Sequence, residues 1–592
     1  MDDKELQKIL SDRHGIKMSL FKTNRINDLI RGTLHDYDIN DIEEFEKPNV
    51  ELTSSENFVN MDSMLTLNQD LKKGNKVYTL VDSDVDGYTS SALIVNYFKK
   101  RYPNNLIEMI IPDTKIHGID GNFDSIPDDC QDLVAPDSSS NDFSALHKLK
   151  DKNVKVFVID HHNIEDERIA SKYNIINNTW TTNDYVDDHY TGVGMVYKCL
   201  EYLDDNYFGN KLANSFLDLV ALGQIGDMED VSDLEIRTLM ISGFKHINNK
   251  FLKEYFSGDD EKPSPKHFAF SLIPKINATT RIGEHIDRQL LMNALTENES
   301  ETFDVVKRKK NHKTGKFDKH EIKQNIYEYV KDRIIKTKTK QDRIVKKAVT
   351  ELTYLSSVDD PMNIAVLDNK YNKGLTGLIA NKLLGDTKKP SFVLITHEDE
   401  NAFKGSMRTP MMYQHAKEDL VGIEGVEYVL GHENAAGIGI DIDKVKSVIY
   451  EMSILFKKSN DFVYKINAVY FNSTPSSKDC KDVQNHLDLF GGRVKEPLVG
   501  MIGLKVQKKD IYIKNNLFKI NINGVELVQF SASQEFIDGI QNNFKSEFCF
   551  DAIGTLGINT WLGRTSPQII LDDIAFSDPI KNRPISKEEL VF

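Results

Sequence analysis

Short apolar runs rich in β-branched residues alternate with helix-like patterns between residues 76 and 300. Each run has the length of a single strand, and the polar and apolar positions that follow it repeat with a helical period. This alternation predicts an α/β domain, in which helices cover both faces of a parallel sheet. The strand candidates are KVYTLV (76–81), LIEMIIP (106–112), QDLVAPD (131–137), VKVFVID (154–160) and KYNIINN (172–178).

The rest of the chain divides into four further segments. Residues 1–75 are expected to be a mixed, mostly helical lead-in that packs on the α/β domain, and residues 351–460 a second, smaller α/β domain. Short strands over 461–592 predict a small β-barrel. Residues 301–350 are expected to form a long basic helix between the two α/β domains. Apolar residues recur there at four-residue steps: Ile322, Ile326, Val330 and Ile334.

The first strand candidate leads into the pattern D-x-D-x-D-G, from Asp82 to Gly87. A calcium-binding EF-hand loop begins in this way, but it needs a glutamate at its twelfth position and an entering helix. The twelfth residue here is Leu93, and a strand precedes the loop. The pattern therefore excludes an EF-hand. It predicts an acidic turn between strand and helix at the C-terminal edge of a sheet, where binding sites gather.

Other predicted strands of this domain also end in acidic residues or histidines. A single aspartate at a strand end is usually a turn or cap residue, whereas several at one sheet edge are typical of a metal site. Carboxylates with one imidazole suit two divalent cations, Mn²⁺ or Mg²⁺, and such a pair favours phosphoester hydrolysis. The candidates are Asp82, Asp84, Asp86, Asp137, Asp160, His161, His162 and Asp227.

The distribution of charge refines this interpretation. The chain carries −16 overall, but residues 307–347 hold sixteen lysines and arginines against five acidic residues, so this stretch is +11 and the remainder −27. One strongly basic stretch is compatible with a phosphate track, and a solvated linker helix is the alternative. Four scattered cysteines and a charged start without an apolar core are typical of a cytoplasmic protein, and we expect no membrane partner.

Several motifs resemble those of the DHH phosphoesterase superfamily and, over nearly the whole chain, its RecJ branch of single-strand-specific 5′→3′ exonucleases. VIDHHN carries the superfamily signature, and GHENAAGIG resembles the G-H-x-x-A-A-G mark of the DHHA1 domain. The other matching stretches are DSDVDGYTSSAL, DLVAPDSSS, LDLVALGQIGDM, IPKINATTRIG, KGLTGLIANKLL, KGSMRT and NTWLGRTSPQIILDDI. The resemblance implies a DHH domain over 76–300, a DHHA1 domain over 351–460 and an oligonucleotide-binding (OB) fold over 461–592.

The resemblance also implies two sets of metal ligands that share one bridging aspartate. The first ion would be held by Asp82, Asp84 and Asp137. The second would be held by Asp86, Asp137, His161 and Asp227.

Neighbouring residues receive supporting roles from the same resemblance. His162 would face the scissile phosphate, and Asp160 would orient a histidine. RecJ proteins usually have Asp-Cys-Gly in the second motif, where this chain reads DSSSND. This departure leaves the bridging ligand open between Asp137 and Asp142. We prefer Asp137 because it directly ends the apolar strand.

Substrate contacts are implied in three places. Arg281 would hold a phosphate, and Asn277 would shape the loop around it. In the DHHA1 domain, residues implied to lie at the 5′-terminal phosphate or adjacent backbone are Gly405, Ser406, Arg408, Gly431 and His432. In the OB fold, Trp561 and Arg564 are candidates for stacking and backbone binding, although Trp561 equally suits a barrel core.

One position departs from the family in a way that affects the substrate. The family usually has an arginine shortly after the "IP" of IPDTKIHGID, where this chain has Thr114 and Lys115. Lys115 is therefore the candidate there. It would offer a point charge instead of a bidentate clamp.

The activity that the resemblance implies is metal-dependent release of 5′ nucleotides from single-stranded DNA, in repair, recombination or replication. We expect a monomer whose partners are single-stranded DNA and, in such pathways, a single-strand-binding protein or a helicase. Two alternatives remain. One is a DHH phosphodiesterase for short oligonucleotides or cyclic dinucleotides, which typically lacks the barrel. The other is a RecJ-like scaffold for a replication partner, which would not need intact metal ligands.

Overall fold

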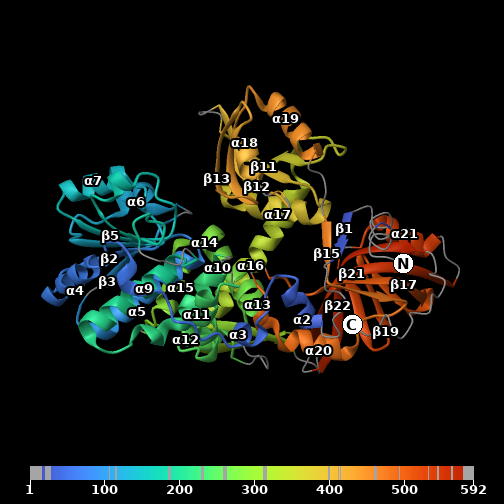
Figure 1. The fold of residues 1–592 in the computed structure, drawn as a ribbon, viewed down its shortest axis with the longest axis horizontal. Coiled ribbons are helices and arrows are strands. Elements are labelled where there is room, and N and C mark those ends of the chain that lie inside the picture. The colour runs from blue at the N-terminus through green and yellow to red at the C-terminus, as the bar shows by residue number, and fades with distance from the viewer. Residues whose placement is uncertain are drawn as a thin grey trace. The chain divides into compact units, whose positions relative to one another are not determined.

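The chain folds into two compact units in the computed structural model. The first unit comprises Lys47–Ile344 with Gly491–Arg493, and the second comprises Met1–Glu46, Val345–Phe490 and Val494–Phe592 (Figure 1). The structure describes residues 8, 17–20, 29–105, 107–113, 116–183, 189–227, 232–257, 263–299, 301–310, 317–397, 401–410, 413, 415–458, 463–491, 494–530, 532–542, 546–561 and 564–577.

A parallel sheet in the order β3-β2-β4-β5-β6 forms the centre of the first unit. Its strands fall on the five predicted runs, which confirms the α/β domain. They are β2 Val77–Leu80, β3 Ile107–Ile110, β4 Asp132–Pro136, β5 Lys155–Asp160 and β6 Asn174–Asn177. Because strand side chains alternate between faces, Val134 joins one apolar layer while Leu133 and Ala135 join the other.

Helices cover both faces of this sheet (Figure 1). Helix α5 (Val85–Arg101) and helix α9 (Gly192–Leu203) pack on one face, and α7 (Phe143–Asp151) packs on the other. Further helices of this part are α4 Ser63–Lys73, α6 Gly118–Asn122 and α8 Glu167–Ala170. The carboxyl ends of the strands therefore open at one edge between two helical layers.

A helical layer follows the sheet in sequence. Helix α10 (Leu217–Gly226) is buried along most of its length, so the apolar run before Asp227 is a helix. Helix α11 (Leu234–Lys245) packs closely on it, because a Cβ at Gly243 would overlap the carbonyl of Leu217. The other helices are α12 Lys250–Tyr255, α13 Pro265–His267, α14 Ile273–Ile282 and α15 His285–Leu295.

The prediction of one helix over 301–350 is wrong in its first half. Strands β7 (Thr302–Lys310) and β8 (Phe317–Asn325) form an antiparallel hairpin, and helix α16 occupies Ile326–Thr350. The base of the hairpin is fixed on the first turns of α16, because the Phe303 and Tyr329 rings stack with centroids 4.0 Å apart. Three predicted apolar positions, Ile326, Val330 and Ile334, are buried in α16, whereas Ile322 lies exposed on β8.

The prediction that residues 1–75 pack on the α/β domain is wrong for the first 46 residues, which belong to the second unit. Strand β1 (Lys17–Leu20) pairs in parallel with β15 (Val463–Ile466), and the Asn467 amide donates to the Asp36 carboxylate at 3.0 Å. The helices of this segment are α2 Leu29–His35 and α3 Ile42–Glu46. These pairings join segments more than 400 residues apart, which no local pattern reveals.

The second unit contains two larger sheets, as the predicted α/β and β segments require. The first has the order β13-β14-β12-β11-β10-β9. Its elements are β9 Thr353–Tyr354, β10 Asn363–Val366, α17 Thr376–Thr387, β11 Ser391–His397, β12 Ala402–Arg408, α18 Ala416–Val421, β13 Val426–His432, β14 Ala435–Asp441 and α19 Val445–Lys458.

The second of these sheets has seven strands in the order β16-β17-β21-β22-β20-β19-β18. Its elements are β16 Ala468–Phe471, α20 Ser477–Asn485, β17 Leu498–Gln507, β18 Ile511–Lys514, β19 Leu517–Ile522, β20 Val525–Gln529, α21 Gln534–Asn542, β21 Glu547–Trp561 and β22 Arg564–Ser577. The C-terminal β segment predicted from the sequence is thus confirmed.

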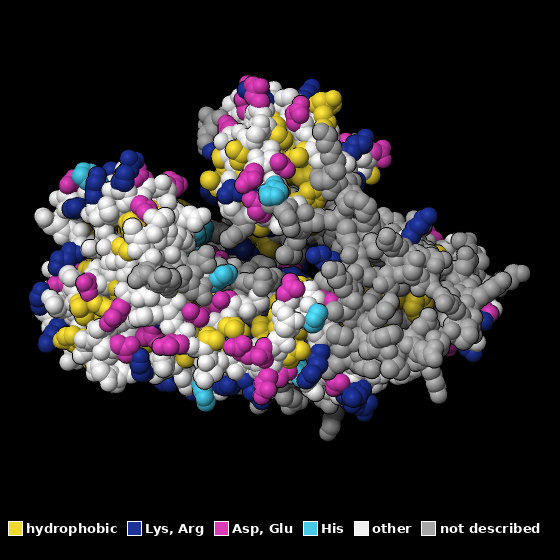
Figure 2. All heavy atoms as spheres, in the orientation of Figure 1, with side chains coloured by type: hydrophobic (Ala, Val, Ile, Leu, Met, Phe, Trp, Pro, Cys, Tyr) yellow, Lys and Arg dark blue, Asp and Glu magenta, His cyan; other side chains and the backbone are white. Residues whose placement is uncertain are grey.

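Acidic and basic side chains intermingle over the described part of the first unit in Figure 2. The visible face therefore carries no continuous field of one sign. None of the helices in the described ranges combines the length and the apolar composition needed to cross a bilayer.

The close packing of β12 on β11 at Gly405 can be tested by mutation. A Cβ there would overlap the carbonyl oxygen of Val393 on β11, so Gly405→Ala should lower the free energy of unfolding by about 1–3 kcal/mol. Gly385→Ala is the matched control, because a Cβ at this exposed position of α17 meets nothing within 4 Å. It should raise stability by about 0.5–1 kcal/mol. Urea unfolding of the two variants distinguishes them, and equal midpoints would contradict this packing.

Candidate metal centre and substrate site

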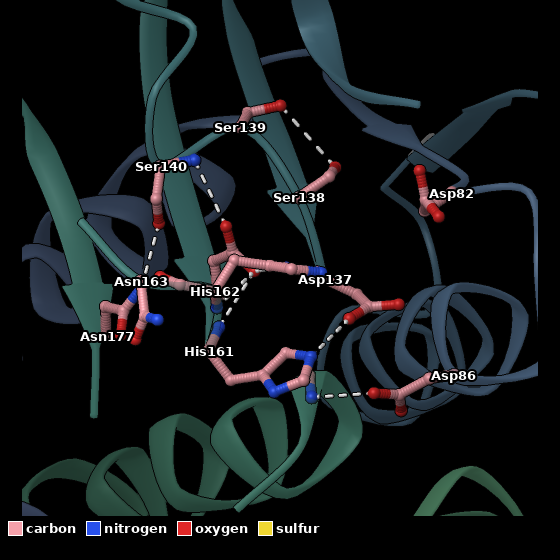
Figure 3. A network of polar contacts seen from close by, with 12 residues as sticks. Asp82, Asp86, Asp137, Ser138, Ser139, Ser140, His161, His162, Asn163 and Asn177 are labelled. Atoms are coloured by element: carbon pink, nitrogen blue, oxygen red, sulfur yellow. Dashed lines mark hydrogen bonds and ion pairs between the residues drawn. The ribbon is translucent and has the colours of Figure 1, made fainter. Parts of the chain in front are cut away.

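The acidic turn after β2 places three carboxylates at the edge of the parallel sheet, of which Figure 3 labels Asp82 and Asp86. Asp82 follows the strand and is buried. Asp84 caps helix α5 and accepts a hydrogen bond from the Gly87 amide at 3.2 Å. Asp86 lies in the first helical turn, where its carboxylate accepts from the Gly192 and Val193 amides at 2.7 and 2.9 Å. Asp86 is thereby fixed by the first amides of helix α9.

Asp137 follows β4 directly and is buried at the same edge. Its backbone has a φ of 61°, in the left-handed region where aspartate and asparagine are tolerated better than most residues. Its amide donates to the Ile159 carbonyl of β5 at 2.7 Å. Asp142 has a different role, because its carboxylate accepts from the Ile119 amide at 2.7 Å. The geometry therefore favours Asp137 over Asp142 as a ligand.

Six predicted ligands converge in two adjacent groups. Within each group, one oxygen or nitrogen atom from every residue lies within 4.8 Å of the others. The first group is Asp82, Asp84 and Asp137, and the second is Asp86, His161 and Asp227. A further group joins Asp137 and His161 to Asp160 and His162. The groups touch through His161, whose Nε2 lies 3.3 Å from Asp137 and 3.7 Å from Asp227 (Figure 3). Asp137 is thus positioned to contribute to both.

Asp160 is held by hydrogen bonds at the end of β5. Its buried carboxylate accepts from the Ser140 amide at 3.1 Å, from the His161 amide at 2.8 Å and from Nδ1 of His162 at 2.7 Å. Burial alone would raise the pKa of Asp160, but the charge of His162 and these hydrogen bonds lower it below its usual range. In return, the Asp160 carboxylate raises the pKa of His162 to about 10. Asp160 therefore holds the imidazole of His162 in place and favours its protonated form.

Crowding of the carboxylates sets the electrostatics of this site. Burial, and then the charges of Asp86, Asp84, Asp82 and Asp227, raise the pKa of Asp137 well above its usual range. Burial and the Asp84 charge raise the pKa of Asp86 to about 7. Like charges this close are unfavourable unless a counter-charge lies among them. Hard oxygen donors with one imidazole fit a pair of divalent cations such as Mn²⁺ or Mg²⁺.

Three glycines create the space in which these carboxylates pack. A Cβ at Gly87 would lie 2.5 Å from Cβ of Asp82, and one at Gly223 would lie 2.6 Å from Asp86. A Cβ at Gly192 would overlap the Asp137 side chain. The sequence reasoning missed Gly192 and Gly223. The available signal was the stretch TGVG, which begins helix α9 with two glycines.

Serines that follow Asp137 in the second motif also take part in the network. Ser139 has a φ of 82°, a conformation that glycine adopts more easily, and its hydroxyl accepts from the Ile119 amide at 2.9 Å. The Ser140 hydroxyl accepts from the Asn177 amide group at 2.9 Å (Figure 3). His117 was also missed, although its Nδ1 lies 2.8 Å from Asp82. His117 lies in the stretch IPDTKIHGID, where no motif marks the histidine as a site residue.

Arg281 and Asn277 lie one turn apart on helix α14, so the expected loop is a helix. Burial lowers the pKa of Arg281, while the charge of nearby Asp84 acts in the opposite direction. Arg281 therefore brings a partly buried positive charge close to the first group of ligands. The Asn277 side-chain oxygen is buried and accepts no hydrogen bond within the described structure.

A second polar site lies in the six-stranded sheet of the second unit. Ser406 and Arg408 project from β12 toward the start of α17, where the Thr376 hydroxyl lies 2.8 Å from the Ser406 hydroxyl. A Cβ at Gly377 would lie 2.8 Å from the guanidinium of Arg408. The arginine therefore crosses the N-terminus of a twelve-residue helix, which favours anions.

The structure describes some of the other predicted substrate residues. Gly431 has a φ of 124°, so its backbone suits glycine. Gly405 is required by the packing of β12 on β11. Arg564 begins β22 and is exposed. Lys115 and the side chains of His432 and Trp561 lie outside the described residues.

Comparison with known proteins gives matches at both ends of the chain. The "DHH family, N-terminal domain" matches residues 76–224, and the "RecJ OB domain" matches residues 475–573. The first match contains both groups of ligands except Asp227, and the second covers most of the seven-stranded sheet.

Two relatives extend the similarity over most of the chain. The SPbeta prophage protein YorK of Bacillus subtilis (strain 168), whose name is that of a single-strand DNA-specific exonuclease, is 30% identical over 523 residues, covering 84% of this chain and 87% of YorK. The single-stranded-DNA-specific exonuclease RecJ of the same organism is 23% identical over 537 residues, covering 86% of this chain and 63% of RecJ.

A solved structure supports the same fold. RecJ from Thermus thermophilus, in complex with Mn²⁺, superposes with a TM-score of 0.66 at 16% identity and covers 93% of this chain and 76% of that one. Its complex with Mg²⁺ superposes with a TM-score of 0.61. At this level of identity, the match establishes the arrangement of elements.

Asp137→Asn tests the role of this carboxylate in cation binding. Mn²⁺ should stabilise the wild type by about 2.7 kcal/mol for each site at a hundredfold excess over its Kd, and so raise its melting temperature, whereas it should stabilise the variant much less. In chelator, the variant should be at least as stable as the wild type, because asparagine suits the positive φ and removes one repelling charge. Thermal unfolding with Mn²⁺ and with EDTA measures both effects.

Asp142→Asn serves as the control for this experiment. It keeps an oxygen that can accept from Ile119 and should respond to Mn²⁺ like the wild type. If Asp137→Asn kept the full response and Asp142→Asn lost it, the assignment of Asp137 would be refuted.

Proposed function

The chain belongs to the RecJ-like family of single-strand DNA exonucleases, and from that premise we propose that it removes 5′ nucleotides from single-stranded DNA by two-metal hydrolysis. The observation that carries the proposal is the convergence of six predicted ligands at one sheet edge: Asp82, Asp84, Asp86, Asp137, His161 and Asp227. The alternative of a binding scaffold is disfavoured, because every one of these positions holds a competent ligand.

Asp82, Asp84 and Asp137 would hold one cation, and Asp86, His161 and Asp227 the other. Asp137 would also bind the second cation, since its carboxylate lies 3.3 Å from Nε2 of His161. When bound, such a pair lowers the pKa of water and neutralises the charge that builds on a phosphoryl group. The chain's own contribution is to keep the ligands in place before substrate arrives. The Gly192 and Val193 amides hold Asp86, and Asp137, at a left-handed backbone position, would direct its carboxylate toward both groups.

Two positive side chains complete the proposed catalytic site. His162 is held by Asp160, whose carboxylate raises the pKa of the imidazole, and would bind a non-bridging oxygen of the scissile phosphate. Arg281 would bind the same or the next phosphate from helix α14, on the side where Asp84 lies. Their charges would stabilise the phosphoryl group as negative charge accumulates during displacement.

The 5′ end of the strand would be bound in the second unit by Ser406 and Arg408. An anion at the start of α17 would meet the positive end of the helix dipole, the guanidinium and two hydroxyl groups, from Thr376 and Ser406. Recognition of the terminal phosphate at this site would give the enzyme its 5′→3′ polarity.

The basic stretch and the OB domain would hold the rest of the strand. Those lysines and arginines of 307–347 that the structure describes divide between strands β7 and β8 and helix α16. Within the described residues, Lys319 and Lys323 on β8 form no ion pair, so they are available to phosphates. The match to the RecJ OB domain supports substrates longer than a dinucleotide, and Arg564 and Trp561 remain candidates there. The biological role would be DNA repair, recombination or replication.

Digestion of end-labelled DNA tests the proposal. Single-stranded DNA with a 5′ label should release labelled mononucleotide first with Mn²⁺ or Mg²⁺, and chelator should stop the reaction. Duplex DNA of the same sequence should resist digestion. Asp137→Asn should reduce the rate by at least a thousandfold, on the order expected when a metal site is disrupted. Release of the 3′ label first, or equal activity in chelator, would refute the proposal.

Arg408→Gln tests recognition of the 5′ end. Loss of charge-assisted hydrogen bonds costs about 1.5–3 kcal/mol, so KM should rise roughly 10- to 100-fold for DNA with a 5′ phosphate and much less for DNA with a 5′ hydroxyl. Lys382→Gln on α17 removes a positive charge that pairs with Asp386 and is the control. Steady-state kinetics on both substrates measure the effect. Equal changes for the two DNA ends would argue against a phosphate site at Arg408.

A further inference from the structure

His117 lies against the first group of metal ligands, although no motif marks it. Its Nδ1 is 2.8 and 3.1 Å from the two carboxylate oxygens of Asp82. The Asp82 side chain is buried, whereas the His117 side chain is 52% exposed and reaches Asp82 from the open side of the site. His117 immediately precedes helix α6.

The backbone beside His117 is fixed to the loop that carries Asp137. The Ile119 amide donates to both the Ser139 hydroxyl, at 2.9 Å, and the Asp142 carboxylate, at 2.7 Å. Gly118 has a φ of 70°, and a Cβ there would overlap Asp142. The unusual backbone of Ser139 and the carboxylate of Asp142 therefore hold the turn in which His117 lies. These backbone contacts therefore fix the position from which His117 reaches Asp82.

In the described structure, the contact of the ring with the candidate metal ligands is its contact with Asp82. The groups of atoms suited to hold a metal in the described structure include Asp82 with Asp84 and Asp137, and none of them includes His117. Nε2 of His117 lies 3.4 Å from the Ser83 hydroxyl. When that hydroxyl donates to Nε2, the proton of the neutral ring is on Nδ1, and Nδ1–H donates to Asp82.

We propose that His117 is a positioning residue for the first cation site: it donates a hydrogen bond from Nδ1 to Asp82 and keeps this carboxylate turned toward Asp84 and Asp137. The proposal rests on the proposed metal site and adds a residue to it. Partners that orient a metal-ligating side chain commonly change metal affinity by about 10- to 100-fold when they are removed. The ligands of the first site are all carboxylates. Through this contact, the position of one of them depends on an imidazole.

Mn²⁺ binding to the full chain without DNA tests this role independently of activity. Calorimetric titration of the wild type should reveal two ions. His117→Phe keeps a ring of similar size without a donor, and one of the two Kd values should rise about 10- to 100-fold while the other stays unchanged. His117→Asn should restore most of the lost affinity, because its amide nitrogen can occupy the place of Nδ1. His147→Ala, at an exposed histidine of α7, should bind both ions like the wild type.

The outcomes separate the failure of this inference from the failure of the proposed function. If the wild type binds two ions and His117→Phe binds both with unchanged Kd, the positioning role is refuted and the metal site stands. If His117→Asn is as weak as His117→Phe, Nδ1 is not the required donor. If the wild type binds no Mn²⁺, the proposed two-metal function fails, and the role of His117 fails with it. Melting temperatures in chelator, expected to be equal for all four proteins, show that each variant is folded.

Discussion

Mutual repulsion of buried carboxylates at one edge of a parallel sheet is the constraint on which the rest of this structure depends. Asp82, Asp86 and Asp137 are almost fully buried, and Asp84 and Asp227 lie beside them. Such a group is unfavourable for a fold by itself, because each charge loses its hydration and meets others of the same sign. Without ions, protonation relieves part of this repulsion, as the raised pKa values of Asp86 and Asp137 indicate. His162 and Arg281 supply some positive charge, and we propose that two cations supply most of it.

The fold maintains this arrangement with backbone groups more than with side chains. Helix α9 directs its first amides at Asp86, the left-handed turn at Asp137 directs that carboxylate inward, and glycines at 87, 192 and 223 leave room for the acids. These features cost stability in any other context, since glycine and positive φ are unfavourable within regular elements. All of these features lie around the acids, where they allow the carboxylates to pack together.

Much of the candidate site could be predicted from the sequence, because it is encoded locally. In a parallel sheet the residues after each strand meet at one edge, so strand patterns alone placed Asp82, Asp137 and His161 near one another. Hairpin β7–β8 was mistaken for a helix, since Ile322 fits the four-residue spacing of Ile326 and Val330 by coincidence. The pairing of β1 with β15 and the contact of His117 with Asp82 were not predictable. Both depend on the meeting of segments whose separation no periodic pattern records.

Everything proposed for this enzyme requires two cations that share Asp137 at the edge of the parallel sheet. Anomalous diffraction from a crystal soaked in Mn²⁺ would locate them. We expect two peaks, one among Asp82, Asp84 and Asp137 and one among Asp86, Asp137, His161 and Asp227. Peaks located elsewhere, or a single peak that Asp137 does not contact, would contradict this arrangement.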